Sequence, residues 1–416
     1  MHPEKLLLIL VALLAVAIML QPRVQRLRLP FAATLLLTGF LGSELIVAMG
    51  QRVDVDAATI HATAYYGLLP LLVFAAAFRI DTSTLRGNLT PIGLLALPMP
   101  LVTWGVLAVL LYVAVGHPTG FPWTSALVAG AILVATEPFP LLARLRKCRF
   151  SKRLAVLLEA EGLITIAMAV ILYHVSLSLA AAGDAGMGLA DLALQVLWDL
   201  AGGALVGIGT SLLALHLSRR LQSPEHQALV ALTATYLAFL GGEVLASASG
   251  IVACLLTGWF FGRATRADFS EMQERFQEQF WLFLSHAADA LIFLLMGITF
   301  TFSLFGERWL AMLIGIGAVM LIRVPQISVA GLAFRLLPGA VALTSKESRS
   351  AWVTGLRGAV ALALALALPV DLPAWWTIQA IVFGVVFFSL VVQAPVAHLL
   401  LERIDRKQDE ASGRPE

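Results

Sequence analysis

The stretch Gly355-Leu356-Arg357-Gly358-Ala359-Val360-Ala361-Leu362-Ala363-Leu364-Ala365 places one arginine at the start of a continuous apolar run. Comparable runs recur along the chain: 59% of its 416 residues are hydrophobic and only 13% are charged. A soluble domain carries about 25% charged residues. A helix needs roughly 20 apolar residues to cross a bilayer, and the strands of a membrane barrel would alternate instead. We therefore predict an all-α membrane protein.

About thirteen membrane-spanning helices are predicted from these runs. Residues 1–402 are expected to form one transmembrane domain, and 403–416 a short cytoplasmic tail that is too short to fold alone and is expected to be disordered. The approximate limits of the spans are 5–20, 30–48, 60–78, 90–116, 122–144, 154–181, 190–217, 226–246, 249–262, 280–303, 308–335, 350–369 and 373–401.

The basic residues predict how the chain is oriented, because Lys and Arg concentrate in cytoplasmic loops. With the N-terminus outside, thirteen spans place 23 of the 28 Lys and Arg residues on the inside. Only Lys5, Arg52 and Arg308 then lie outside, while Arg323 and Arg357 fall within spans. We therefore expect an outside N-terminus and a cytoplasmic C-terminus.

Several charged residues fall inside the predicted spans, where each costs about 2.5–3.5 kcal/mol on insertion scales. A structural salt bridge or a side chain that reaches the interface is the simpler explanation for Glu44, Asp199 and Glu243. Four further acids share the spans with two arginines, so at least some carboxylates lack a cationic partner. Such a carboxylate takes up a proton readily, which is what a site shared by a proton and a cation requires. These six residues are Glu137, Glu159, Glu161, Asp289, Arg323 and Arg357.

The fifth span contains a predicted helix break. In Ala131-Ile132-Leu133-Val134-Ala135-Thr136-Glu137-Pro138-Phe139-Pro140, an acid lies beside two prolines. Each proline removes an N–H donor and clashes with the carbonyl four residues earlier. The freed carbonyls of a broken helix can bind a cation. A simple proline kink is the alternative interpretation.

Six motifs follow one another along the chain in a characteristic order. Together they resemble the monovalent cation:proton antiporters of the Na+/H+ exchanger family, of the bacterial NhaP-like type. The last motif is the most specific, since it is almost the family's GLRGAVSLALAL. The six are Leu69–Phe74 with Arg79–Asp81 and Leu85–Asn88, Ala135–Pro138, Leu157–Leu163, Tyr236–Ala238 with Gly250–Ala253, Phe280–Trp281 with Phe293–Gly297, and Gly355–Ala365.

The resemblance implies a fold of two inverted repeats, with a core bundle, a dimerisation bundle and a homodimeric assembly. It implies that two unwound helices cross at mid-membrane, one near Thr136–Pro138 and the other near Gly355–Gly358 or in a neighbouring span. It also implies exchange of Na+ or K+ for H+ by alternating access in a bacterial inner (plasma) membrane.

The sequence departs from the family at its main ion-binding carboxylate. The family's sixth span carries an Asn-Asp pair, and alignment on Glu161 places Thr165 and Ile166 at those two positions. Isoleucine can neither bind an ion nor carry a proton. The family's glutamate at position 161 pairs with a membrane arginine, for which Arg323 and Arg357 are the candidates here.

We therefore predict that the titrating site has moved to Glu137 and Asp289, which would bind Na+ or K+ with Thr136 and Thr165 as neutral oxygen ligands. Two alternatives stay open: a transporter of the same fold with another substrate, and a relative that no longer transports. An enzyme is not indicated, because the sequence shows no nucleophile–base pair, phosphate loop or metal-ligand spacing. No cofactor and no nucleic acid partner is expected, and the basic clusters flank the lipid bilayer.

Overall fold

The computed structural model of the chain describes residues 3–25, 30–49, 57–80, 98–115, 120–137, 152–185, 189–336 and 355–411. All regular elements within these ranges are helical, three of them (η1, η2 and η3) as short π-helices. In chain order they are α1 Pro3–Gln25, α2 Phe31–Ala48, α3 Ala57–Ala62, η1 Thr63–Leu68, α4 Leu69–Phe78, α7 Pro98–Ala114, α8 Trp123–Val134, α10 Lys152–Ala185, α11 Leu189–Arg220, α12 Pro224–Leu240, η2 Gly241–Leu245, α13 Gly250–Asp268, α14 Glu271–Thr299, α15 Phe302–Leu336, α17 Ala359–Leu366, α18 Trp375–Phe388, η3 Ser389–Gln393 and α19 Ala394–Ala411.

When adjoining elements are joined, the described ranges contain thirteen helical segments. Each segment corresponds to one of the predicted spans. The third joins α3, η1 and α4, the eighth joins α12 and η2, and the last joins α18, η3 and α19. Eight segments are long and apolar enough to cross a membrane, and α7 and α8 are shorter apolar helices. The predicted all-α membrane fold is confirmed for this part of the chain.

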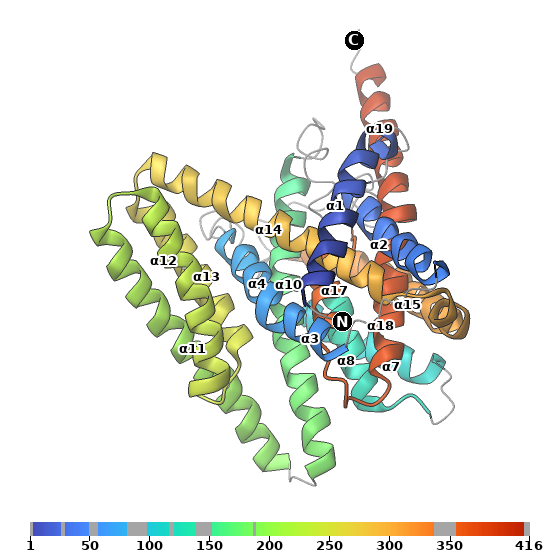
Figure 1. The fold of residues 1–416 in the computed structure, drawn as a ribbon, viewed down its shortest axis with the longest axis horizontal. Helices are drawn as coiled ribbons and strands as arrows, with labels where there is room; N and C mark the ends of the chain where they lie inside the picture. The colour runs from blue at the N-terminus through green and yellow to red at the C-terminus, as the bar shows by residue number, and fades with distance from the viewer. Residues whose placement is uncertain are drawn as a thin grey trace.

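The helix pairs with extensive contacts form two groups, and Figure 1 shows α11, α12 and α13 of the second group together at the left. In one group α8 packs between α7 and α10, and α15 joins α7 to α18. In the other group α2 packs on α14, α4 on α13, and α13 on α11 and α12. The long helix α14 runs obliquely across the molecule and touches α17, so that it brings the second group to the centre of the first.

The start of α14 shows how local sequence sets the limit of a helix. Ser270 accepts a hydrogen bond from the Gln273 N–H, and the Gln273 side chain accepts one from the Ser270 N–H, which is a capping box.

At the C-terminal end of the described chain, α19 continues to Ala411. The expectation that the tail beyond residue 402 is disordered is therefore wrong as far as Ala411, because the helix extends beyond its apolar part.

Candidate functional site

Two interrupted helices meet where the sequence predicted a crossing. Helix α8 ends at Val134, and Ala135 leaves the helical conformation with φ −56° and ψ 122°. The residue before a proline is disfavoured in a helix, which accounts for a break at Glu137, although Pro138 itself lies outside the described residues. The Glu137 N–H donates to the Leu356 carbonyl at 2.9 Å. The break in the fifth span therefore lies directly against residues 355–358, which precede α17.

At this crossing each interrupted helix is capped by a charged side chain from the other one. The Glu137 carboxylate accepts hydrogen bonds from the N–H groups of Ala359 (3.1 Å) and Val360 (2.7 Å), the first two residues of α17. The Arg357 guanidinium donates to the Leu133 carbonyl at 2.8 Å, in the last turn of α8. An anion near a helix N-terminus and a cation near a helix C-terminus both interact favourably with the helix dipole. The crossing is therefore stabilised by two matched charges.

The glycines of the Gly355-Leu356-Arg357-Gly358 motif leave room for charged side chains. A Cβ atom on Gly358 would collide with the Glu137 carboxylate. A Cβ on Gly355 would lie 2.6 Å from Arg323 Nε. Neither glycine has the positive φ angle that would demand glycine for backbone reasons. Glycine is therefore required at both positions for packing reasons, because an acid and an arginine from two other segments occupy the space that a side chain would fill.

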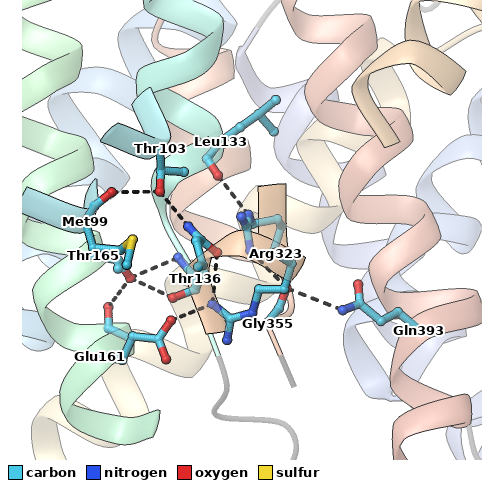
Figure 2. A network of polar contacts seen from close by, with 12 residues as sticks. Met99, Thr103, Leu133, Thr136, Glu161, Thr165, Arg323, Gly355 and Gln393 are labelled. Carbon is cyan, nitrogen blue, oxygen red and sulfur yellow. Dashed lines mark hydrogen bonds and ion pairs between the residues drawn. The ribbon is translucent and has the colours of Figure 1, made fainter. Parts of the chain in front are cut away.

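The two threonines predicted as neutral ligands are in contact (Figure 2). Their hydroxyl oxygens are 2.7 Å apart, and the Thr136 N–H also donates to Thr165 Oγ1 at 3.2 Å. Thr165 Oγ1 donates to the Gly162 carbonyl within α10. Thr165 therefore attaches α10 to the interrupted part of the fifth span, one residue before Glu137.

A buried arginine on α15 pairs with the acid on α10. Arg323 Nη1 lies 2.5 Å from Glu161 Oε1, and the exposed side-chain fractions are 4% for the arginine and 38% for the glutamate. Gln326 accepts a second hydrogen bond from Arg323. Of the two arginines that could pair with Glu161, the structure selects Arg323, because Arg357 is used at the helix crossing. The side chain of Glu159 lies outside the described residues.

Asp289 lies on α14, half-buried, and approaches the crossing from the second group of helices. Its charge is within electrostatic range of Glu137 and of Arg79, which follows α4. Arg79 acts on Glu137 as well, and it donates to Ser285 Oγ at 3.1 Å, one turn before Asp289. This role of Arg79 could not be predicted from the sequence, because its place after an apolar run is typical of a cytoplasmic loop residue.

Three other acids in the spans hold helix ends or helix pairs, and two of them do so through hydrogen bonds rather than through the predicted salt bridge or interface contact. Glu44 accepts from the N–H that begins α15, at 2.8 Å. Glu243 accepts from the Gly250 N–H at the start of α13 and from the Tyr65 hydroxyl, at 3.0 and 2.9 Å. Asp199 accepts from a serine hydroxyl at 3.1 Å and lies 3.3 Å from His174.

The position of the family's main carboxylate is buried and apolar. Ile166 is 2% exposed, directly after Thr165 in α10. No carboxylate is available at position 166, so among the described side chains the acids near the crossing are Glu137 from the fifth span and Asp289 from α14. Glu161 lies nearby in its ion pair with Arg323.

Interrupted membrane helices that cross, with charged groups at their ends, define the class of secondary transporters with discontinuous helices. Residues 9–403 match the sodium/hydrogen exchanger family, transmembrane. This chain belongs to that family.

Relatives and a solved structure agree with this assignment. The chain is 28% identical over 351 residues to the Na+/H+ antiporter ApNhaP of Aphanothece halophytica, covering 83% of this chain and 65% of that protein. It is 29% identical over 352 residues to the low-affinity Na+/H+ antiporter NhaS1 of Synechocystis, of which it covers 64%. The chain thus spans slightly less than two thirds of these two relatives. The sodium proton antiporter MjNhaP1 of Methanocaldococcus jannaschii has the same fold, with a TM-score of 0.76 and 21% identity over 95% of this chain and 100% of that one.

Proposed function

We propose that this chain exchanges a monovalent cation, Na+ or K+, for protons across a bacterial inner membrane by alternating access. The observation that best supports this function is the crossing of two interrupted helices at the Glu137 carboxylate, with the charge of Asp289 on α14 within electrostatic range of it. Carboxylate, hydroxyl and freed main-chain oxygens are the groups with which discontinuous helices bind Na+ and H+.

The two carboxylates have different tasks in this proposal. Both oxygens of Glu137 accept N–H groups of α17, so this side chain is held in one position and serves as a fixed anionic ligand. Asp289 exchanges a proton for the cation. Thr136 and Thr165 supply neutral oxygens. The Thr136 hydroxyl keeps its acceptor lone pairs when it donates to Thr165, whereas Thr165 accepts from both the N–H and the hydroxyl of Thr136 and must release one of them to bind the cation.

The wider architecture belongs to the same proposal. Residues 1–402 form one transmembrane unit, with the N-terminus outside and residues 403–416 in the cytoplasm, which the distribution of Lys and Arg supports. The resemblance to the family supports a homodimer, and mass measurement of the purified protein in detergent tests that state.

Purified protein in liposomes that contain a pH-sensitive dye tests the function. Gradients of Na+, K+ and Li+ are imposed in turn, and we expect proton flux with Na+ or K+. Flux should be lost in Asp289→Asn and strongly reduced in Glu137→Gln. The exposed Glu278→Gln on the same helix as Asp289 is the matched control.

Full activity in both site variants would contradict the roles given to Glu137 and Asp289. Absence of flux for all three cations in the unaltered protein would contradict the exchange itself. Ile166 would then mark a change of substrate or the end of transport.

A further inference from the structure

Four polar residues follow one another at four-residue intervals along α14: Gln277, Trp281, Ser285 and Asp289. Residues spaced by four lie above one another on one face of a helix. With a rise of about 1.5 Å per residue, the row extends about 18 Å from near the beginning of α14 to Asp289. Gln277, Trp281 and Ser285 are 0%, 1% and 5% exposed, so this polar row lies inside the protein.

The outer half of the row is buried without hydrogen-bond partners. Both amide atoms of Gln277 and the indole Nε1 of Trp281 are buried and have no hydrogen-bond partner among the residues that the structure describes. An unsatisfied buried polar group costs about 1–3 kcal/mol. In folded proteins such groups are normally satisfied by internal water, and the successive polar partners that a chain of waters needs are present here.

Further unpartnered atoms lie on the helices next to the beginning of α14. Gln227 Oε1 at the start of α12 and Ser218 Oγ at the end of α11 are also buried and lack a hydrogen-bond partner in the described part of the chain. The loop between these two helices is tied to α14, because Gln273 Nε2 donates to the Gln222 carbonyl at 3.2 Å. The row along α14 thus begins among polar groups of the same kind.

The inner half of the row leads to the exchange site. Arg79 Nη2 donates to Ser285 Oγ at 3.1 Å, and the Arg79 charge acts on both Asp289 and Glu137. Trp281 is held in place by Phe74, whose ring centroid is 4.2 Å away, so its N–H edge has a fixed position. A serine hydroxyl and a fixed indole N–H are suited to ordering water between Gln277 and Asp289.

We propose that this row, Gln277, Trp281, Ser285 and Arg79, lines a water-filled route by which protons reach and leave Asp289 from the end of the molecule where α14 begins. The inference rests on the proposed exchange at Asp289. In the orientation predicted from the basic residues, that end is cytoplasmic. A proton moves along the waters and ends on an Asp289 carboxylate oxygen, and it leaves along the same waters when the cation binds.

Two apolar substitutions test the route by transport. Gln277→Leu keeps the approximate size of the side chain and Trp281→Phe keeps an aromatic ring against Phe74, while both remove the polar atoms. We expect the rate of cation-driven proton flux in liposomes to fall about tenfold, the equivalent of about 1.4 kcal/mol on the barrier, while the cation concentration for half-maximal rate stays unchanged. Gln279→Leu makes the same change on the exposed face of α14 and should leave the rate unaltered. Unaltered rates in both row variants would overturn the proposal.

Water beside Trp281 can be detected without transport. Hydroxyl radicals generated from bound water by X-ray irradiation should oxidise Trp281 despite its 1% exposure, and Gln277→Leu should reduce that oxidation. The buried Tyr173, which donates to a main-chain carbonyl away from the row, should stay protected. If Trp281 is as protected as Tyr173, the row is dry and the route is wrong. If Trp281 is oxidised but no cation drives proton flux, the route stands and the proposed exchange fails.

Discussion

Glu137 and Arg357 each cap the helix from which the other one emerges. The carboxylate holds the first two N–H groups of α17, and the guanidinium holds a carbonyl in the last turn of α8. The ends of an interrupted helix expose main-chain groups that would be costly in a membrane. This exchange of caps explains how the chain can break two helices where no bulk water satisfies them. It also means that Glu137 has a structural task besides any role in ion binding.

Removal of the Glu137 carboxylate should therefore destabilise the protein. We expect Glu137→Ala to lower the free energy of unfolding by about 2 kcal/mol, because two charge-assisted hydrogen bonds and a favourable dipole interaction are lost. Glu137→Gln should cost less, since its amide oxygen still accepts one N–H. Thermal unfolding in detergent measures both variants against Glu278→Ala, which removes an exposed acid. Equal stability of Glu137→Ala and the control would show that the cap contributes nothing.

A methyl group at position 358 should disturb the same cap from the other side. In Gly358→Ala the new Cβ would occupy the place of the Glu137 carboxylate, so the carboxylate must move away from α17. We expect a loss of about 2 kcal/mol of stability together with reduced cation-driven proton flux. Gly317→Ala in α15 is the matched control, because no atom lies within 4 Å of its added Cβ. A Gly358→Ala variant as stable and active as Gly317→Ala would contradict this account of the motif.

Much of the fold could be predicted from the sequence, because apolar runs and basic loops are direct consequences of the bilayer. The break near Glu137 was also predictable, since Pro138 acts locally. The partners of the charged residues were not. Arg323 and Arg357 both lie in spans, and only their positions across the bundle decide that Arg323 pairs with Glu161.

The approach of Arg79 to Asp289 was likewise hidden from the sequence, because it joins residues on two separate helices. A sequence signal for the polar row did exist. Trp281, Ser285 and Asp289 in the predicted tenth span, with Gln277 just before it, recur every fourth residue, and this spacing predicts one helix face. Whether that face is buried depends on packing against α4 and other helices, which the pattern alone does not contain.

The pair of Glu161 and Arg323 should be strongly coupled. Glu161→Gln leaves the 4% exposed Arg323 without its anionic partner, and Arg323→Gln leaves the acid without a cation. Breaking a buried pair costs about 3–5 kcal/mol, but Glu161 is 38% exposed and solvent screens part of this, so we expect about 1–3 kcal/mol for each single variant. The double variant should be more stable than the sum of the two losses predicts. Additive losses in this cycle would show that the two side chains do not interact.

The exchange should be electroneutral. In the proposed cycle Glu137 keeps its charge, because α17 holds both of its oxygens, and Asp289 is the carboxylate that changes its protonation. One proton would then leave for each monovalent cation that binds. A membrane potential imposed on liposomes should therefore leave the rate of Na+-driven proton flux unaltered. A rate that follows the sign of the potential would require a second titrating group, and Glu137 would be the first candidate.

Returning a carboxylate to position 166 tests whether the ion site has moved. Ile166 directly follows Thr165, whose hydroxyl contacts Thr136 at 2.7 Å, so an aspartate there would lie close to the crossing. If Asp289 has replaced the family's carboxylate, Ile166→Asp should restore cation-driven proton flux to the inactive Asp289→Asn variant. Ile166→Asn is the control, because it is similar in size and polarity but cannot carry the proton. Because Ile166 is 2% exposed, burying a carboxylate there should also reduce thermal stability, so flux is compared per folded protein. Rescue by the asparagine as well as by the aspartate would contradict a titrating role for this position, and an Asp289→Asn variant with full flux would remove the premise that the site has moved.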